Sequence, residues 1–388
     1  MIPYSRQEIL KKDIDEVKKI LRSDFLTQGP VVPRFENAVA NYCSSSHAIA
    51  VNSGTSALHL ACLALKLGKG DFLWTSPNTF PASANCALYC GANVDFVDID
   101  PKTYNISISA LSSKLAKAEK LGKLPKVVVP VHFAGQPCDM LAIKKLSKKY
   151  GFKIIEDASH AIGASYNNIK VGSCRYSDIT VFSFHPVKII TTGEGGMALT
   201  NDDKLSDHIR RLSTHGITRD KKLMELRPIN EIWNYQQIEL GLNYRMSDIH
   251  AALGLSQLNR LDEYVTIRQK IASRYNLKFL NSDLKIPWQR KNTYSSYHLY
   301  PICISKKKIK KTQKDFFDVL KKSGVTPNVH YIPVHRHPYY EKLGFKSGDF
   351  PEAELFHREA ISLPIYSSLS EKKQDVVIKS ILQFLNHD

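Results

Sequence analysis

A chain of 388 residues is long enough for one large domain and one smaller one, each with its own core. Hydrophobic residues make up 43% of it and charged residues 23%, an ordinary balance for a globular protein. We find neither an apolar run of the roughly 18 residues that a membrane-spanning helix needs nor the apolar core of a secretion signal, so we expect a cytoplasmic protein with no membrane partner.

The net charge of +17 raises the alternative of a basic regulator that binds DNA. The lysines are scattered, however, and the densest run, KKKIKK at residues 306–311, has no interleaved aromatic residues. No helix-turn-helix pattern with clustered basic residues is found, so we expect no nucleic-acid partner. The seven cysteines form no CxxC pair, which predicts reduced, mostly buried thiols and no metal site.

The first half of the chain alternates short apolar runs with helical patterns. The expected strands are 48–51, 72–75, 94–98, 127–131, 153–156 and 179–183, and the expected helices between them include 81–91 and 139–150. This alternation predicts βαβ units around a mainly parallel sheet, and hence an α/β fold. Ligands of such sheets bind at the carboxyl ends of the strands.

The pattern changes in the second half of the chain. Residues 245–275 have the apolar spacing of one long helix. Beyond them Tyr300 and Ile304 belong to an alternating strand pattern, and helices are expected near 312–323 and 370–386.

These elements predict three parts of the chain. They are an N-terminal segment (1–24), a large domain (25–275) and a smaller C-terminal α/β domain (276–388). A helix near 7–23 is expected to pack with the smaller domain.

Two side chains after neighbouring strands have complementary chemistry. Lys188 follows the strand expected at 179–183 and precedes a turn rich in threonine and glycine. Asp157 ends the preceding strand, where an acidic side chain points into the ligand crevice. Alone, either would be an ordinary surface or loop residue. Together they predict a site that pairs an amine with a carboxylate.

An anion site is expected where Gly54, Thr55 and Ser56 join a strand to an apolar helix. The glycine permits a tight turn, and the amides of the first helical turn point at whatever lies beyond the helix. The same residues would also suit a simple helix cap. Ser183 could add a hydroxyl to this anion, and Phe80, after another strand, could stack on a flat ring or pack in the core.

Six motifs, taken in chain order, resemble those of the DegT/StrS sugar aminotransferases. They are LTQGP (26–30), NSGTSAL (52–58), EDASHA (156–161), SFHPVK (183–188), GEGG (193–196) and LNYRMSD (242–248). The resemblance implies fold type I, the aspartate aminotransferase fold, with pyridoxal 5′-phosphate (PLP) as cofactor. It also implies a homodimer with shared active sites.

The resemblance assigns a role to each cofactor residue. Lys188 would be the catalytic Schiff-base lysine, Asp157 the partner of the pyridine nitrogen, and His160 a neighbour of the phenolic oxygen. Phe80 would stack on the ring. The phosphate would be held by Gly54, Thr55, Ser56 and Ser183, and by Asn243 of the other subunit.

Further motifs are similar to one subgroup of the family. They are IPYSRQ (2–7), HGITR (215–219), NVHYIPVH (328–335) and the Pro-Val pair before Lys188. Members of this subgroup transfer an amino group from L-glutamate to C4 of a UDP-linked 4-keto-6-deoxy-N-acetyl sugar in pseudaminic acid biosynthesis, which serves flagellin glycosylation. The likeness implies sugar-nucleotide contacts from Tyr4, Asp24, Phe25, Leu26, Thr27, His330, Tyr331, Ile332 and Pro333.

Alternatives to this interpretation remain open. His330 and His335 could be ordinary loop histidines. The chain could be another aminotransferase of the family, acting at C3 or at C4 of a different sugar nucleotide. A family dehydratase is disfavoured because those enzymes carry histidine in place of Lys188, and a catalytically dead subunit is disfavoured because the expected cofactor residues are all present.

Overall fold

The computed structural model describes residues 1–226, 233–304 and 311–386, so the basic run at 306–311 lies almost wholly outside the described residues. Over these three stretches we find no helix that combines the length and the apolar character needed to cross a membrane. The seven cysteines are all free thiols, and Cys90 is the one that is partly exposed.

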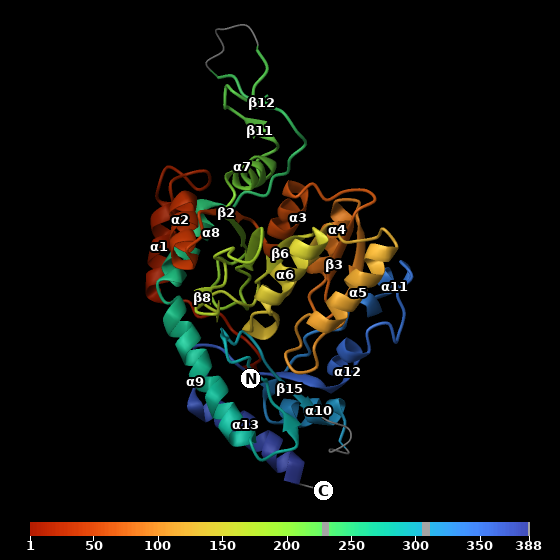
Figure 1. The fold of residues 1–388 in the computed structure, drawn as a ribbon. Coiled ribbons are helices and arrows are strands. Elements are labelled where there is room, and N and C mark those ends of the chain that lie inside the picture. The colour runs from red at the N-terminus through yellow and green to blue at the C-terminus, as the bar shows by residue number, and fades with distance from the viewer. Residues whose placement is uncertain (227–232, 305–310, 387–388) are drawn as a thin grey trace.

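A seven-stranded sheet forms the centre of the molecule (Figure 1). In spatial order its strands are β2 (His47–Val51), β10 (Gly196–Thr200), β9 (Ile179–Ser183), β6 (Lys153–Asp157), β5 (Val127–Val129), β3 (Phe72–Thr75) and β4 (Asn93–Phe96). β10 is antiparallel to both of its neighbours, and the other pairs are parallel. The predicted α/β fold with a mainly parallel sheet is therefore confirmed. β10 was not expected, because it starts within the glycine-rich GEGG turn.

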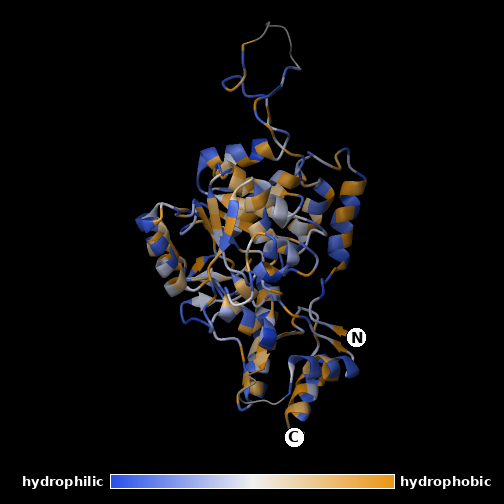
Figure 2. Ribbon diagram, turned by 90° about the vertical axis from the view of Figure 1, so that its right-hand side faces the viewer, coloured by the Kyte–Doolittle hydropathy of each residue, from blue (hydrophilic) through white to orange (hydrophobic). Residues whose placement is uncertain are grey.

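Both faces of this sheet are covered by helices, so side chains of both orientations are apolar. Val127, Val129 and Ile155 join a core with α3, α4 and α7. Val128 and Ile154 face the other way, toward α5 and α6. The β2–β10 end of that second face is covered by α2 and α8. Figure 2 shows the hydrophobic residues gathered in these inner layers.

The covering helices have the following bounds: α2 (Val31–Cys43), α3 (Gly54–Ala64), α4 (Ala82–Tyr89), α5 (Ile108–Lys120), α6 (Met140–Tyr150), α7 (Asp203–Leu212) and α8 (Asp248–Leu258). A short helix η1 (Phe133–Gly135) precedes α6. A small sheet of β14 (Thr293–Tyr294), β7 (Ser165–Tyr166) and β8 (Ile169–Lys170) lies at the periphery.

A separate apolar core lies in the C-terminal part of the chain. It is built from α9 (Leu261–Phe279), the sheet of β13 (Leu284–Lys285), β15 (Tyr300–Ile304) and β17 (Ala360–Leu363), and the helices α10 (Gln313–Lys322) and α13 (Glu371–Asn386). β16 (Val325–Thr326), η2 (Val334–Arg336), α11 (Pro338–Glu341) and α12 (Pro351–Glu359) connect these elements. The domain limits at 25 and 276 stay a prediction.

The single helix expected over 245–275 is instead two helices, α8 and α9, which separate at Asn259 and Arg260. The guanidinium of Arg260 donates to both carboxylate oxygens of the buried Asp13, at 2.8 and 2.7 Å. This tertiary contact holds the junction, so α8 packs on the N-terminal helix α1 (Lys11–Leu21) while α9 continues into the C-terminal core (Figure 1).

The N-terminal segment divides between the two cores. β1 (Ile2–Pro3) pairs in parallel with β16 of the C-terminal part. The helix α1 (Lys11–Leu21) packs on α8, which corrects the expectation that this helix packs with the smaller domain. The reason is its buried Asp13, whose carboxylate also accepts from Ser256 on α8.

A narrow arm projects from the body of the molecule beyond α7 (Figure 1). Its base is a hairpin of β11 (Ile217–Thr218) and β12 (Gln236–Gln237). Apolar side chains of the arm are open to solvent, among them Leu226, Trp233 and Leu240.

Candidate active site

A cavity of about 500 Å³ opens at the carboxyl ends of the central strands. Its lining comes from the segments that follow β2, β3, β6 and β9, from Tyr4 near the N-terminus, and from residues 328–331. Because parallel strands present their carboxyl ends at one edge, residues far apart in the chain meet here.

Most of the expected cofactor residues line this cavity: Gly54, Thr55, Phe80, Asp157, His160, Ser183 and Lys188. Ser56 does not line it; its hydroxyl donates to Asn52 Oδ1 at 2.6 Å and its amide donates to Ser53 Oγ at 3.0 Å. Asn243 also lies outside the cavity, where it bridges to Thr214 near the base of the arm.

The expected sugar-contact residues divide into two groups. Tyr4, His330 and Tyr331 line the cavity, whereas the others do not: Asp24, Phe25, Leu26, Thr27, Ile332 and Pro333. The segment 24–27 is exposed and lies beside the start of α8, where Leu26 O accepts from the amide of Asp248 at 3.0 Å. The positions of these six residues do not support a role for them in the cavity of their own chain.

Several lining residues were not expected: Ser53, Thr79, Ser159, His185, Glu194, His298 and Asn328. Ser159 and Glu194 lie inside the motifs EDASHA and GEGG, so the motifs themselves could have indicated them. His298 had no such signal, because it lies in an apolar stretch just before β15.

Lys188 lies on the loop that joins β9 to β10. Burial lowers the pKa of its ammonium group to about 8, and the negative charge of Asp157 opposes part of that shift. At pH 7 about a tenth of Lys188 is therefore an uncharged amine, far more than for an ordinary lysine, and this form can act as a nucleophile or a base.

Asp157, at the end of β6, is 5% exposed and has a carboxylate that is fixed by two donors. Ser83 Oγ donates to Oδ2 at 2.6 Å, and the amide of Ser159 donates to Oδ1 at 3.1 Å. The Ser83 hydroxyl is in turn 2.8 Å from Thr79 Oγ1. Each carboxylate oxygen keeps a lone pair for a further donor such as a protonated ring nitrogen.

A wall of uncharged rings faces Lys188. Burial, together with the positive charge of Lys188, holds the pKa of His160 well below its usual value and lowers that of His330 to about 3. His160 Nε2 is 3.0 Å from the hydroxyl of Tyr331, and its ring lies 4.4 Å from that of His298. His330 Nδ1 is hydrogen-bonded to a serine hydroxyl at 2.8 Å. These rings are neutral at physiological pH.

An anion cradle forms where α3 begins at Gly54. A Cβ on Gly54 would lie 2.9 Å from Ser183 Cβ, so only glycine lets the helix start approach the Ser183 hydroxyl this closely. The first-turn amides of Gly54 and Thr55 have no partner within the helix and carry its positive dipole end. This donor set suits a phosphate ester, and with Lys188, Asp157 and the 59% exposed ring of Phe80 it fits PLP.

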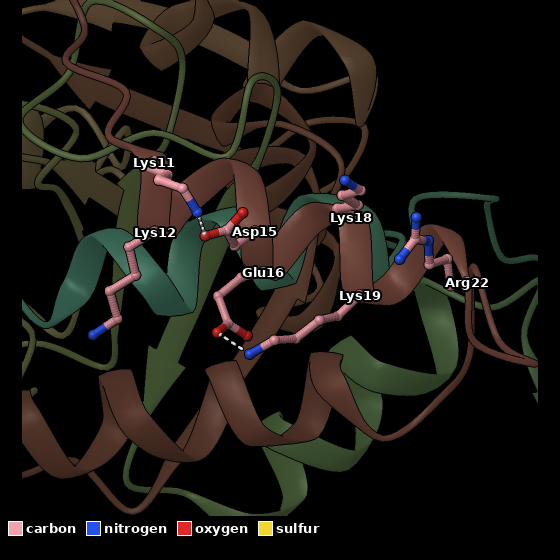
Figure 3. Close-up of a pocket in the computed structure, with 7 residues that line it drawn as sticks. All are labelled: Lys11, Lys12, Asp15, Glu16, Lys18, Lys19 and Arg22. Carbon is pink, nitrogen blue, oxygen red and sulfur yellow. Dashed lines mark hydrogen bonds and ion pairs between the residues drawn. The ribbon is translucent and has the colours of Figure 1, made fainter.

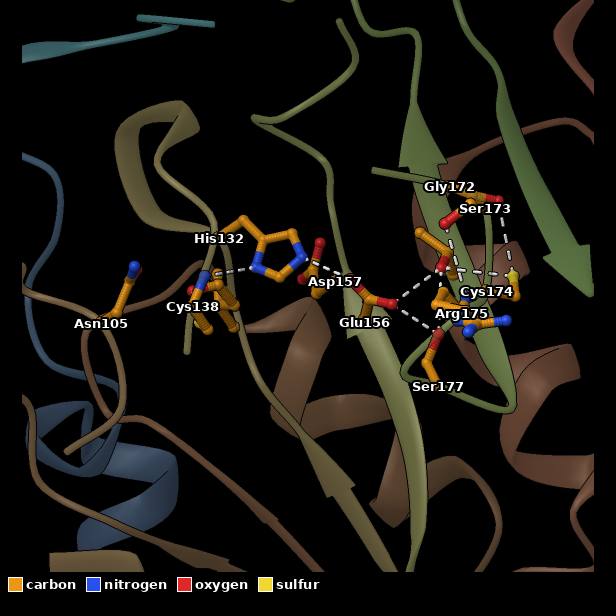
Figure 4. A network of polar contacts seen from close by, with 12 residues as sticks. Asn105, His132, Cys138, Glu156, Asp157, Gly172, Ser173, Cys174, Arg175 and Ser177 are labelled. Carbon is orange, nitrogen blue, oxygen red and sulfur yellow. Dashed lines mark hydrogen bonds and ion pairs between the residues drawn. The ribbon is translucent and has the colours of Figure 1, made fainter. Parts of the chain in front are cut away.

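A second polar group lies behind the site, on the opposite face of β6 (Figure 4). Glu156 accepts from His132 Nε2 at 2.7 Å, from Ser177 and from Thr180 Oγ1 at 3.3 Å. The amide of Cys138 donates to His132 Nδ1 at 3.1 Å, so Nε2 is the nitrogen whose proton is directed at Glu156. The network is satisfied internally, and its side chains do not line the cavity.

An open depression along α1 is lined by charged side chains alone (Figure 3). Lys11 and Asp15 pair at 2.6 Å, as do Lys19 and Glu16. Such exposed pairs within one helix contribute little to stability. We interpret this surface as a solvated helix face.

Comparison with known proteins is consistent with this geometry. The model of the DegT/DnrJ/EryC1/StrS aminotransferase family matches residues 7–382. The spore coat polysaccharide biosynthesis protein SpsC of Bacillus subtilis is 40% identical over 98% of this chain and 96% of its own length. The UDP-4-amino-4,6-dideoxy-N-acetyl-beta-L-altrosamine transaminase of Campylobacter jejuni is 37% identical over 99% and 98%.

A solved structure extends the likeness to the fold. Helicobacter pylori PseC, an aminotransferase involved in the biosynthesis of pseudoaminic acid, superimposes with a TM-score of 0.88. The two chains are 31% identical, and the match covers 100% of each.

Proposed function

The chain belongs to the DegT/DnrJ/EryC1/StrS aminotransferase family, and we propose that it transfers an amino group from L-glutamate to C4 of a UDP-linked 4-keto-6-deoxy-N-acetyl sugar. The sugar has the L-arabino configuration, and the product is UDP-4-amino-4,6-dideoxy-N-acetyl-β-L-altrosamine. The aminotransferase activity and the PLP cofactor follow from the family. The choice of sugar is supported by the Campylobacter and Helicobacter relatives.

One observation carries the chemical part of the proposal. Lys188 and Asp157 share a cavity in which the lysine pKa is lowered to about 8. PLP, when bound, supplies a carbonyl that holds an amine and a ring that stabilises negative charge on the neighbouring carbon. Lys188 Nζ would take the proton from the α-carbon of glutamate and later return one to C4 of the sugar.

The other residues of the cavity would bind and orient. Asp157 would keep the pyridine nitrogen protonated, with its own carboxylate fixed by Ser83 and Ser159. The cradle at Gly54, together with Ser183, would hold the phosphate. These assignments rest on the cavity geometry and on the family motifs.

The sugar side of the cavity is proposed to include Tyr4 and His330, whose rings lie 5.0 Å apart. Both face the cavity beside Asn328. An uncharged, partly aromatic wall suits the face of a deoxy sugar, which has a methyl group in place of a hydroxymethyl.

A homodimer with shared sites is part of the same proposal. The arm exposes Trp233 to 71% and Leu240 to 86%, and this apolar surface is available to a second copy of the chain. Its base is anchored: Glu239 accepts from His208 Nε2 at 2.8 Å and from Arg211. Asn243, at this base and outside its own chain's cavity, would reach the phosphate of the second copy.

Mixed dimers test the shared site. Lys188→Arg and Asn243→Ala are each expected to be inactive alone, and mixing and reassembling the two should restore part of the activity. In such a dimer one site combines an intact Lys188 with an intact Asn243. No recovery, despite exchange of subunits shown by differently tagged chains, would contradict the sharing.

The sugar is tested with two epimers. Purified protein with PLP and glutamate is given UDP-linked 4-keto-6-deoxy sugars of the L-arabino and the D-xylo configuration, and products are separated by mass and retention. We expect amination of the L-arabino sugar, and Lys188→Arg as control should aminate neither. Amination of the D-xylo sugar alone would reject the proposed substrate while leaving the aminotransferase activity intact.

A further inference from the structure

Residues 2–5, here called the N-terminal strap, connect the C-terminal part of the molecule to the cavity. The amide of Ile2 donates to Gly324 O at 2.7 Å, and the strand pairing places Pro3 beside Thr326. Tyr4 O then accepts from the amide of Ile365 at 3.0 Å. The strap is thus held by backbone hydrogen bonds along most of its length.

The end of the strap contacts the lysine loop. Ser5 is 7% exposed, and its hydroxyl donates to Val187 O at 2.9 Å. Val187 directly precedes Lys188, so a residue near the N-terminus bonds to the peptide group that carries the lysine.

The lysine loop is tied firmly at its base but weakly at its tip. At the base, the amide of Phe184 donates to Gly195 O at 2.8 Å, and that of Thr192 to Phe184 O at 3.0 Å. At the tip, Pro186 has no N–H to donate. The contacts within the tip are the bond from the amide of Lys188 to His185 O at 2.9 Å and a long one from the amide of Val187 to His185 Nδ1 at 3.5 Å. The bond from Ser5 therefore restrains the part of the loop that the base does not reach.

We propose that Ser5 is a positioning residue for Lys188. Because the strap also carries the Tyr4 ring to within 5.0 Å of the His330 ring, it links the expected sugar wall to the lysine loop. The role in positioning rests on the proposed function, since it supposes that Lys188 binds the cofactor. The restraint of the loop by Ser5 does not depend on that supposition.

Hydrogen–deuterium exchange of the full chain without PLP tests the restraint. Ser5→Ala should speed exchange of the amides of His185, Val187 and Lys188 by about fivefold, the effect of losing one net hydrogen bond. Ser5→Thr keeps the hydroxyl and should exchange like the parent. Ser147→Ala is the matched control, because Ser147 is 8% exposed and its hydroxyl donates to Phe152 O at 2.6 Å, on α6.

PLP affinity, measured by the visible absorbance of the bound cofactor, tests the positioning role. We expect affinity about fivefold weaker in Ser5→Ala and unchanged in Ser147→Ala, because a less ordered Lys188 loses more entropy on binding. Parent-like exchange at 185–188 in Ser5→Ala would overturn the proposal, as would faster exchange spread over the whole chain.

Faster exchange confined to the loop, with unchanged affinity, would overturn the positioning role. Failure of the parent protein to bind PLP through Lys188 would instead reject the proposed function, and the exchange data would still decide whether Ser5 restrains the loop.

Discussion

Glu156 and Asp157 are neighbouring acids at the end of β6, yet their environments differ in kind. Strand geometry turns them to opposite faces. Glu156 enters a closed network with His132, Ser177 and Thr180 (Figure 4), whereas Asp157 faces a cavity that also contains Lys188. Both are buried and both are hydrogen-bonded.

The two carboxylates differ in the hydrogen-bonding capacity that each has left for a ligand. Glu156 accepts from three side chains of the protein, so its contacts are complete and its role is structural. Asp157 accepts from one hydroxyl and one amide and retains free lone pairs beside open space. A buried acid is a candidate for function when its contacts leave capacity for a ligand, and burial alone does not separate the two cases.

Replacing Lys188 by arginine should abolish the chemistry of the cavity and leave the hydrogen-bond network of Glu156 intact. Loss of the proton-transfer amine is expected to lower turnover by about 10³-fold or more. The variant's thermal unfolding midpoint should stay close to that of the parent. Turnover is measured by release of 2-oxoglutarate, and a variant with parent-like turnover would remove Lys188 from the mechanism.

Asp157→Asn should lower turnover by about 10²–10³-fold, because it removes the charge that holds the ring nitrogen protonated. It should also change the titration of Lys188. The Asp157 charge raises the lysine pKa, so its removal should move the pKa below about 8. The pH dependence of PLP binding reports this, and a midpoint that moves to higher pH would contradict the assigned contact.

Glu156→Ala should affect stability rather than chemistry. It leaves the His132 N–H and the Ser177 hydroxyl without their buried acceptor, which is expected to cost about 3 kcal/mol of unfolding free energy. Urea unfolding measures the loss, and turnover per folded molecule should stay within a few fold of the parent. A stable but inactive variant would show that Glu156 takes part in catalysis, and would contradict the structural role assigned to it here.

Ser83→Ala is expected to give the smallest effect, because it removes only one of the two donors that fix Asp157. A hydrogen bond to a charged group contributes about 1.5 kcal/mol. If that amount is lost from the stabilisation of the transition state, kcat should fall roughly tenfold. Thr79→Ser, which keeps the hydroxyl that contacts Ser83, serves as the control. Equal losses in both variants would show that Ser83 does not act through the carboxylate.

The central sheet and the loops that carry the cofactor residues could be predicted because local signals specify them: short β-branched runs, glycine turns and motifs. The division between α8 and α9 could not, because it depends on the contact of Arg260 with Asp13, far away in the chain. The packing of α1 on α8 could not be predicted for the same reason. β10 was missed because its first residue, Gly196, belongs to a glycine-rich turn.

In the site, too, residues marked by local sequence could be predicted and residues defined by long-range contacts could not. Asp157 and Lys188 follow predicted strands, so topology brings them together. Ser83 and His298 are defined only by what they contact in three dimensions, and nothing in their local sequence marks them. Asn243 and residues 24–27 lie outside the chain's own cavity, and the role proposed for Asn243 requires a second copy of the chain.

Chemical fixation of the cofactor tests the central claim most directly. The protein is incubated with PLP, treated with borohydride to make the link to its lysine permanent, digested, and mapped by mass spectrometry. The account predicts a pyridoxyl label on Lys188 and its absence from the Lys188→Arg variant. A label on another lysine, or a protein that binds no PLP, would contradict it.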